Sequence, residues 1–207
     1  MNEDLLTLID RARTAGGYLS VRDTVRLIEG GNIVPDPFSV LISRFVTIGT
    51  GNLFHPSVVL EARAGAPLAI GDRNRFCTGT VIVAATGPIR IGHGNQFGEG
   101  GFVARTNRPD AEIRIGDGGR YVGGVAVFGL SRLGSGSQVL GGITVDGCEL
   151  GDGRSFAEPD PDLRGGVLKG QGTARGLRIA AGEVIVGEGG FLQEKLQRQT
   201  DFHPKPG

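Results

Sequence analysis

Three histidines are the side chains in this sequence best suited to move a proton at neutral pH: His55, His93 and His203. An imidazole has a pKa near neutrality, so it can accept a proton as a general base and return it as an acid. We expect His93 at an outward-facing turn, from which its ring could reach a cleft. His55 follows a large apolar residue and should point away from the core, which makes it a second candidate base. His203 lies near the last residue, where we expect a solvated side chain.

Three cationic side chains stand close together further along the sequence: Lys169, Arg175 and Arg178. Ammonium and guanidinium groups bind phosphate through charge-assisted hydrogen bonds, so this group is a candidate phosphate site. The same residue types are also common on exposed loops, and both interpretations remain open.

A repeat organises the middle of the sequence. Six segments begin with a branched aliphatic residue followed by glycine: Ile48-Gly49, Ile70-Gly71, Ile91-Gly92, Ile115-Gly116, Leu133-Gly134 and Leu150-Gly151. Six residues after each aliphatic residue comes a second large apolar residue: Phe54, Phe76, Phe97, Tyr121, Val139 and Phe156. In the first five segments a third follows after six more: Leu60, Ile82, Val103, Val127 and Val145. The segments begin 22, 21, 24, 18 and 17 residues apart.

Three inward apolar residues at a spacing of six describe a coil with three short faces. Such coils bury their apolar residues only by stacking, so the sequence predicts a parallel β-helix of about seven coils. A β-sandwich also has short strands and glycine-rich turns, but its strands would alternate with a period of two at irregular spacing. Because the longer coils carry extra residues at a corner, we expect outward loops at residues 62–67, 84–88 and 105–112.

Two columns of polar residues recur at the corners of the predicted coils. In the first column we expect the left-handed backbone conformation that asparagine tolerates; its members are Asn52, Asn74 and Asn95. The second column contains Thr50, Asp72, His93, Asp117, Ser135 and Asp152. Because polar turn residues fill the rest of that column, the alternative to a catalytic His93 is one more turn residue.

Both ends of the sequence depart from the repeat. Residues 3–13 and 21–29 have the apolar spacing of short amphipathic helices, with Ser20 as a cap of the second helix. Residues 157–176 predict an irregular insertion, residues 191–199 a final helix, and residues 201–207 a loose tail. We therefore divide the chain into an N-terminal helical segment (1–33), a β-helix (34–190), and a C-terminal helix and tail (191–207).

Composition excludes several classes of protein. Lys and Arg together number 22, as do Asp and Glu, and this zero formal charge argues against a nucleic-acid partner. No run of 18 apolar residues and no signal-peptide layout is present, so we expect no membrane association. Cys77 and Cys148 are too few for a disulfide framework, and we interpret them as buried thiols of a cytoplasmic protein.

The recurrent Ile-Gly hexads, over residues 34–191, resemble the hexapeptide-repeat family. That resemblance implies a left-handed coil, an exception to the usual handedness of parallel crossovers. The segment Val34-Pro35-Asp36-Pro37 resembles the start of the coils in bacterial acetyltransferase domains of this family. The spacing within residues 46–62, 87–103 and 188–196 is similar instead to the small pointed-end subunits of dynactin, which are non-catalytic.

The two resemblances imply two functions. The bacterial members imply a homotrimer that transfers an acyl group from acetyl-CoA, or a similar donor, to a small hydroxyl or amine acceptor. His93 or His55 would then be the base, and Lys169, Arg175 and Arg178 would meet the phosphates of coenzyme A. The dynactin subunits imply a catalytically silent assembly or binding module.

Some hexapeptide-repeat proteins are carbonic anhydrases that bind zinc through three histidines of two subunits. His55 and His93 could supply two such ligands. Gly98 and Glu99 stand near the place of the third. Because catalytic zinc usually needs three protein ligands, we expect no metal.

Overall fold

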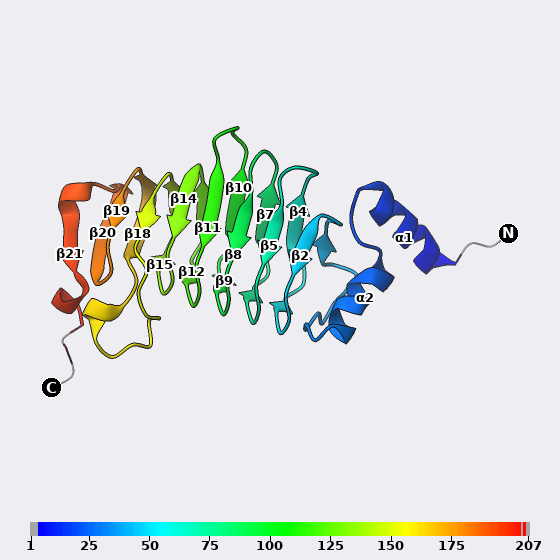
Figure 1. Ribbon diagram of the computed structural model, residues 1–207, viewed down its shortest axis with the longest axis horizontal. Helices are drawn as coiled ribbons and strands as arrows, with labels where there is room; N and C mark the ends of the chain where they lie inside the picture. Colours follow the sequence, from blue (N-terminus) through cyan, green and yellow to red (C-terminus); the bar gives the residue numbers. More distant parts are fainter. Residues whose placement is uncertain (1–3, 204, 206–207) are drawn as a thin grey trace.

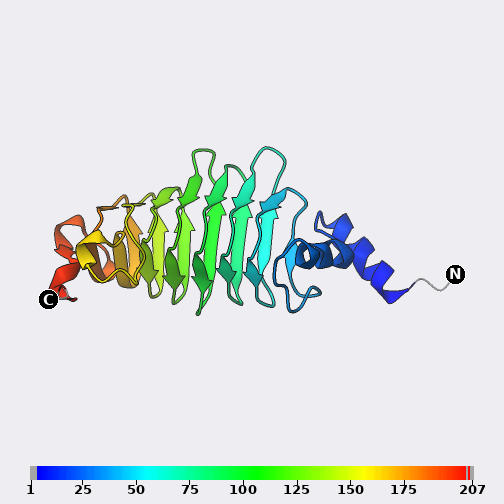
Figure 2. The same ribbon diagram turned by 60° about the horizontal axis from the view of Figure 1, so that its bottom comes forward.

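The computed structural model describes residues 4–203 and 205, and these form a left-handed parallel β-helix with two α-helices at its N-terminal end (Figure 1). The fold class predicted from the repeat is thereby confirmed. The coils stack along the long axis of the molecule, and the helices lie beyond the first coil (Figure 2). No helix among the described residues is long and apolar enough to cross a membrane.

Each coil contributes strands to three faces. The first face contains β1 (Leu41–Ile42), β4 (Val59–Ala62), β7 (Thr80–Ala84), β10 (Phe102–Thr106), β13 (Val125–Phe128), β16 (Ile143–Asp146) and the second half of β18 (Val167–Arg175). The second face contains β2 (Val46–Ile48), β5 (Leu68–Ile70), β8 (Ile89–Ile91), β11 (Glu112–Ile115), β14 (Leu130–Leu133), β17 (Glu149–Leu150) and β19 (Arg178–Ile179). The third face contains β3 (Leu53–Phe54), β6 (Arg75–Phe76), β9 (Gln96–Gly98), β12 (Arg120–Val122), β15 (Gln138–Leu140), the first half of β18 and β20 (Glu183–Gly190).

The core is a stack of the inward residues that the hexad spacing predicts. The rings of Phe54, Phe76, Phe97 and Tyr121 follow one another at centroid distances of 5.1, 5.0 and 5.4 Å. All four are fully buried, and the Tyr121 hydroxyl lies 3.0 Å from Ser137 Oγ. Burial raises the pKa of Tyr121. Stacked aromatic rings add stabilisation beyond the area that they bury.

Two expected core residues lie elsewhere. Val103 faces outward, and Ala104 holds the inward position between Ile82 and Val127. The reason is one extra residue at the preceding corner, because seven positions separate Phe97 from Ala104 where six separate the equivalent residues of other coils.

Phe156 is the second exception: its side chain is 48% exposed. Leu168 holds the expected core position, in register with Val139. The chain leaves the coil after the Arg154 bridge, passes through the short 3₁₀ helix η1 (Pro161–Leu163), and resumes the coil at β18. The irregular segment is therefore shorter than the predicted 157–176.

The glycines within residues 165–176 belong to a regular coil. Gly170 has φ +128°, and a Cβ built there would lie 1.9 Å from the carbonyl oxygen of Gly187 on the next coil. Only glycine allows this backbone conformation and this close approach together. The predicted outward loops at 62–67, 84–88 and 105–112 connect first-face strands to second-face strands, and the tallest lies between β10 and β11 (Figure 1).

The N-terminal end is helical, as expected. Helix α1 spans Leu5–Ala15 and α2 spans Val21–Glu29, whereas Glu3, within the predicted first helix, lies outside the described residues. Ser20 Oγ accepts the N–H of Asp23 at 2.9 Å, which confirms the predicted cap. The buried Arg13 joins the helices to the first coil, because its guanidinium donates to the carbonyl oxygens of Leu19 and Val40.

The predicted C-terminal helix is wrong. Residues 191–201 form the short 3₁₀ helix η2 (Gln193–Lys195), strand β21 (Leu196–Arg198) and a further 3₁₀ helix η3 (Gln199–Asp201). Strand β21 pairs antiparallel with β20, so its backbone covers the open edge of the last coil. A helix there would leave the β20 edge groups without partners.

Candidate functional site

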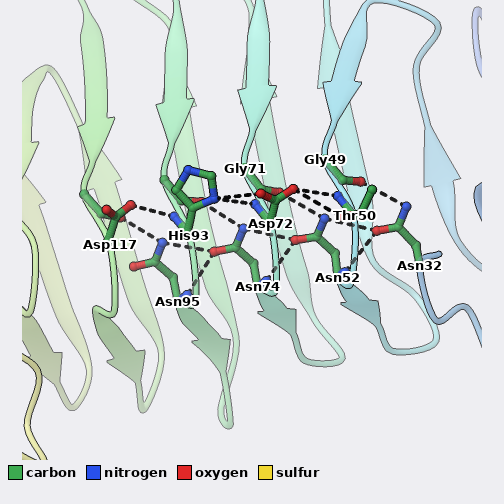
Figure 3. A network of polar contacts seen from close by, with 12 residues as sticks. Asn32, Gly49, Thr50, Asn52, Gly71, Asp72, Asn74, His93, Asn95 and Asp117 are labelled. Atoms are coloured by element: carbon green, nitrogen blue, oxygen red, sulfur yellow. Dashed lines mark hydrogen bonds and ion pairs between the residues drawn. The ribbon is translucent and has the colours of Figure 1, made fainter. Parts of the chain in front are cut away.

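His93 belongs to a ladder of side chains at the corner between the second and third faces (Figure 3). Each side chain in this outer ladder accepts the backbone N–H of the residue one coil earlier. The donor and acceptor pairs are Thr50 to Asp72 at 2.8 Å, Asp72 to His93 at 2.9 Å, His93 to Asp117 at 2.7 Å, Asp117 to Ser135 at 3.1 Å, and Ser135 to Asp152 at 2.8 Å. The second polar column of the sequence is therefore a continuous hydrogen-bonded ladder.

An inner ladder of buried asparagines runs beside it (Figure 3). Oδ1 of Asn52 accepts both the backbone N–H and the side-chain Nδ2–H of Asn74, at 2.9 and 3.0 Å, and Asn95 repeats this pattern on Asn74. These asparagines do not adopt the left-handed conformation that we expected. The positive φ angles stand one residue earlier, at Gly51, Arg73 and Gly94, so the asparagines recur for their amide groups.

The His93 ring has two hydrogen-bonding choices, both on Asp72. Nδ1 lies 2.9 Å from the Asp72 backbone nitrogen and 3.2 Å from Asp72 Oδ2. In one neutral tautomer, Nδ1 is unprotonated and accepts the backbone N–H, while Nε2 carries the ring proton. In the other, Nδ1 carries the proton and donates it to the carboxylate, so that Nε2 has a free lone pair. Only in the second tautomer can Nε2 act as a general base. A substrate could reach the ring, because the His93 side chain is 49% exposed.

The Asp72 carboxylate is suited to orient the ring because it stays ionised. The backbone N–H of Thr50, which donates to Asp72 Oδ1, is the main influence that lowers the pKa of Asp72, and the nearby His93 and Arg73 lower it further. A carboxylate beside Nδ1 selects the Nδ1–H form of a histidine in many catalytic pairs.

His55 lies at a different corner, between the third and first faces. Its backbone N–H donates to the carbonyl oxygen of Phe76, and its ring is partly buried. The Nε2 atom is buried and has no hydrogen-bond partner among the described residues. His93 and His55 lie at different corners of the coil, so a single chain does not bring the two candidate bases together.

The three predicted phosphate ligands are also separated. Lys169 projects from the third face, whereas Arg175 and Arg178 stand on either side of the corner between the first and second faces. Arg175 Nε lies 3.4 Å from Asp146 Oδ2, and Arg178 Nε lies 3.9 Å from Glu149 Oε2. A pocket of about 410 Å³ lies beside Arg178 on the second face.

The second face carries an arginine column that was not predicted from the sequence. Arg90, Arg114 and Arg132 stand in register on neighbouring strands, each flanked by inward residues. Glu112 pairs with the first two, at 3.1 and 2.6 Å, and Arg132 pairs with Glu149 at 3.4 Å. The repeated Ile-Arg-Ile at residues 89–91 and 113–115 is the signal that predicts this column.

The cysteines and metal-binding residue types show no further site in the described part of the chain. Cys77 and Cys148 are both buried, and burial raises the pKa of the Cys148 thiol. Across residues 4–203 and 205, no three histidine, cysteine, aspartate or glutamate side chains are grouped as a metal site.

No protein-family model and no curated protein sequence matches this chain. Among solved structures, the chain is similar to PerB from Caulobacter crescentus, which was crystallised in complex with CoA and GDP-perosamine. The two are 19% identical, and the match covers 86% of this chain with a TM-score of 0.19. The chain spans 63% of the length of that PerB chain.

Neither His93 nor His55 lines any of five surface pockets formed by the described residues. A substrate at His93 would therefore need a second wall beyond that of the single chain. His93 therefore differs from a catalytic residue that a single chain already places in a cleft.

Proposed function

We propose that this protein is an acyltransferase that moves an acyl group from acetyl-CoA, or a similar thioester, to a small hydroxyl or amine acceptor. The observation that carries the proposal is the half-exposed His93 ring with the ionised Asp72 carboxylate 3.2 Å from Nδ1. Of the candidate bases, His93 has this orienting group, whereas the described residues give His55 none.

The transfer needs one base and then one acid. His93 Nε2 takes the proton of the acceptor as its oxygen or nitrogen attacks the thioester carbon. The carbon–sulfur bond then breaks, and the departing thiolate takes the proton from the imidazolium. Asp72 stabilises the imidazolium between the two steps, because its carboxylate accepts the Nδ1–H.

The positions of the cations favour a site between chains. Lys169 on the third face and Arg178 on the second face would reach one donor only if that donor lay between two copies. Since His93 also lacks a second wall, a homo-oligomer is part of this proposal. We propose the trimer implied by the hexapeptide-repeat resemblance, with Lys169, Arg175 and Arg178 near the CoA phosphates.

A non-catalytic assembly or binding module is the second candidate, and one observation favours it. His93 has the same ladder position as Asp72, Asp117 and Ser135, and its Nδ1 accepts a backbone N–H as their oxygens do. If His93 serves only to accept this backbone N–H, it needs no substrate, and the protein needs no catalytic activity.

A thermal-shift measurement with millimolar acetyl-CoA tests the first step. A ligand at about 100 times its Kd adds about 2.7 kcal/mol to the stability of the folded state, which for a protein of this size raises Tm by roughly 5–10 °C. No shift in folded, oligomeric protein, together with no consumption of acetyl-CoA over a panel of amino sugars and amino acids, would favour the assembly module.

The variant His93→Asn tests the base. Asparagine can still accept the Asp72 N–H, so the ladder is kept while the base is lost. We expect turnover of acetyl-CoA to fall at least about a hundredfold at unchanged Tm. Asp117→Asn, one coil further, is the matched control and should keep full turnover; equal turnover in both variants contradicts the role of His93.

A further inference from the structure

A second pocket, on the outer side of the third face, combines features of a ligand site. It has a volume of about 260 Å³ and lies over β12, β15, β18 and β20. The loop that carries Phe156 and Arg164 closes one side, and the chain after η3 closes the other with Phe202 and His203. Three segments that are distant in sequence therefore build the pocket together.

The lining of this pocket is basic. Arg120, Arg164, Lys169 and His203 line it, and no aspartate or glutamate does. The second-face pocket differs in this respect, because Glu112 and Glu149 lie among its arginines and pair with them. Lys169 forms no ion pair with any described residue. An uncompensated cluster of cations attracts an anion.

Two polar groups in the pocket have no partner in the described structure. Nε of Arg120 is buried without a hydrogen bond, and its guanidinium lies 5.4 Å above the Phe156 ring. Gln138 is only 8% exposed, and its side-chain amide makes no hydrogen bond with a described residue. A buried donor without a partner is costly, so Arg120 Nε favours a bound acceptor, and the Gln138 amide is available to the same ligand.

Apart from Gln199, the rest of the lining is apolar. Val184, Val186, Leu140 and the rings of Phe156 and Phe202 form it, and both rings are about half exposed, at 48% and 47%. Drug-sized ligands fill roughly 300–1,000 Å³, so a pocket of this size suits a smaller molecule. The Phe156 ring already lies against the Arg120 guanidinium, and its exposed surface can pack against a planar ligand.

We propose that this pocket binds a small organic anion, with a single ring or short apolar body against Phe156 and Val186 and a carboxylate or phosphate monoester facing Arg120 and Lys169. The Gln138 amide would donate to the same anionic group. His93 does not line this pocket. Lys169 is shared with the proposed CoA-phosphate contacts, but binding of a small anion needs no acyl-CoA and is tested separately.

Calorimetric titration of the full chain with benzoate and with phenyl phosphate tests the proposal and distinguishes the two anionic groups. We expect saturable binding of at least one of them. Benzamide and inorganic phosphate, which each lack one half of the ligand, should bind at least about tenfold more weakly. No saturable binding of either anion, or equal binding of inorganic phosphate, would overturn the proposal.

Lys169→Gln and Phe156→Ala assign the binding to this pocket. Because Lys169 is exposed and unpaired, its loss should leave Tm unchanged and weaken the titrated anion about ten- to a hundredfold, the usual range for a charge-assisted hydrogen bond. Phe156→Ala should weaken the aromatic anion and leave inorganic phosphate unaffected. Lys195→Gln, at an exposed lysine of η2 that does not line the pocket, is the matched control; an equal loss there, or none in Lys169→Gln, would refute the site.

Discussion

At the scale of single residues, the two ladders solve one problem in different environments. Every coil must satisfy the backbone N–H groups of its corner, and a side chain on a neighbouring coil does so at each step. The acceptor lies on the next coil in the outer ladder and on the preceding coil in the inner ladder. At the buried inner position only asparagine occurs between residues 32 and 95, because a neutral amide both donates and accepts without a charge to desolvate. At the exposed outer position aspartate, serine and histidine all serve.

This difference predicts unequal costs for deleting a ladder residue. Asn74→Ala removes the acceptor of two Asn95 donors and the donor to the Gly92 carbonyl oxygen, and the side chains of Asn74 and Asn95 are both buried. At about 1–3 kcal/mol for a buried group left unsatisfied, we expect a loss on the order of 3 kcal/mol in the free energy of unfolding, measured with urea. Asp117→Ala removes one exposed acceptor that water can replace, so it should cost less than about 1 kcal/mol. Equal costs would contradict the distinction between the ladders.

The sequence predicts which residues recur at these corners but not why. The column of Asn52, Asn74 and Asn95 is visible from spacing alone. Whether an asparagine is chosen for its backbone angle or for its amide depends on the residue before it, and here Gly51 and Gly94 have the positive φ angles. The position of His93 in a column of acceptors was likewise predictable, whereas the proximity of its ring to the Asp72 carboxylate depends on a side-chain rotamer.

At the scale of the elements, glycines decide how tightly neighbouring coils turn. Gly123, Gly141, Gly170 and Gly187 stack at the corner between the third and first faces, and the first three have φ between +97° and +128°. At each of these three, a Cβ would overlap the backbone of the next coil. The same corner in the third coil carries the extra residue that turns Val103 outward, so the corners also set the register of the following strand.

The stack predicts that two similar-looking glycines differ in their tolerance of alanine. In Gly141→Ala, the new Cβ would meet the Gly170 carbonyl oxygen at 2.0 Å at a φ of +116°. We expect this variant to lose at least about 2 kcal/mol of stability, since strain and overlap add. Gly147→Ala has φ +66° and an open environment, so it should lose only about 1 kcal/mol. Urea unfolding of both variants makes the comparison, and a more damaging Gly147→Ala would refute it.

The ends of the elements were harder to predict than the repeat. Phe156 and Leu168 both fit the six-residue spacing of the repeat. Only the pairing of β18 with β15 shows that Leu168, not Phe156, occupies the core position. The apolar residues of 191–199 fit a helix locally, but the unpaired edge of β20 favours an extended strand. Contacts distant in sequence override local spacing at both places.

At the scale of the whole molecule, the outer side of the first face carries a strip of apolar residues. Val59, Val81, Val103 and Ala126 lie in register there, one per coil, and each is partly exposed. The second face carries Thr47, Ala69 and then charged arginines at the equivalent outward positions. The three faces of the prism are therefore unequal, and the first is the best suited to contact another protein chain.

The strip leads to a prediction about oligomeric state. We expect the protein to form a homo-oligomer, proposed above as a trimer, through the first face, and light scattering after size-exclusion chromatography measures this directly. Val81→Glu should shift the assembly to monomers, because a carboxylate at the centre of an apolar contact loses its hydration without gaining a partner. Thr47→Glu, at an exposed outward position of the second face, should leave the mass unchanged. A wild-type monomer, or an assembly that persists in Val81→Glu, would contradict this face as the interface. A wild-type monomer would also remove the second wall that the proposed His93 site requires.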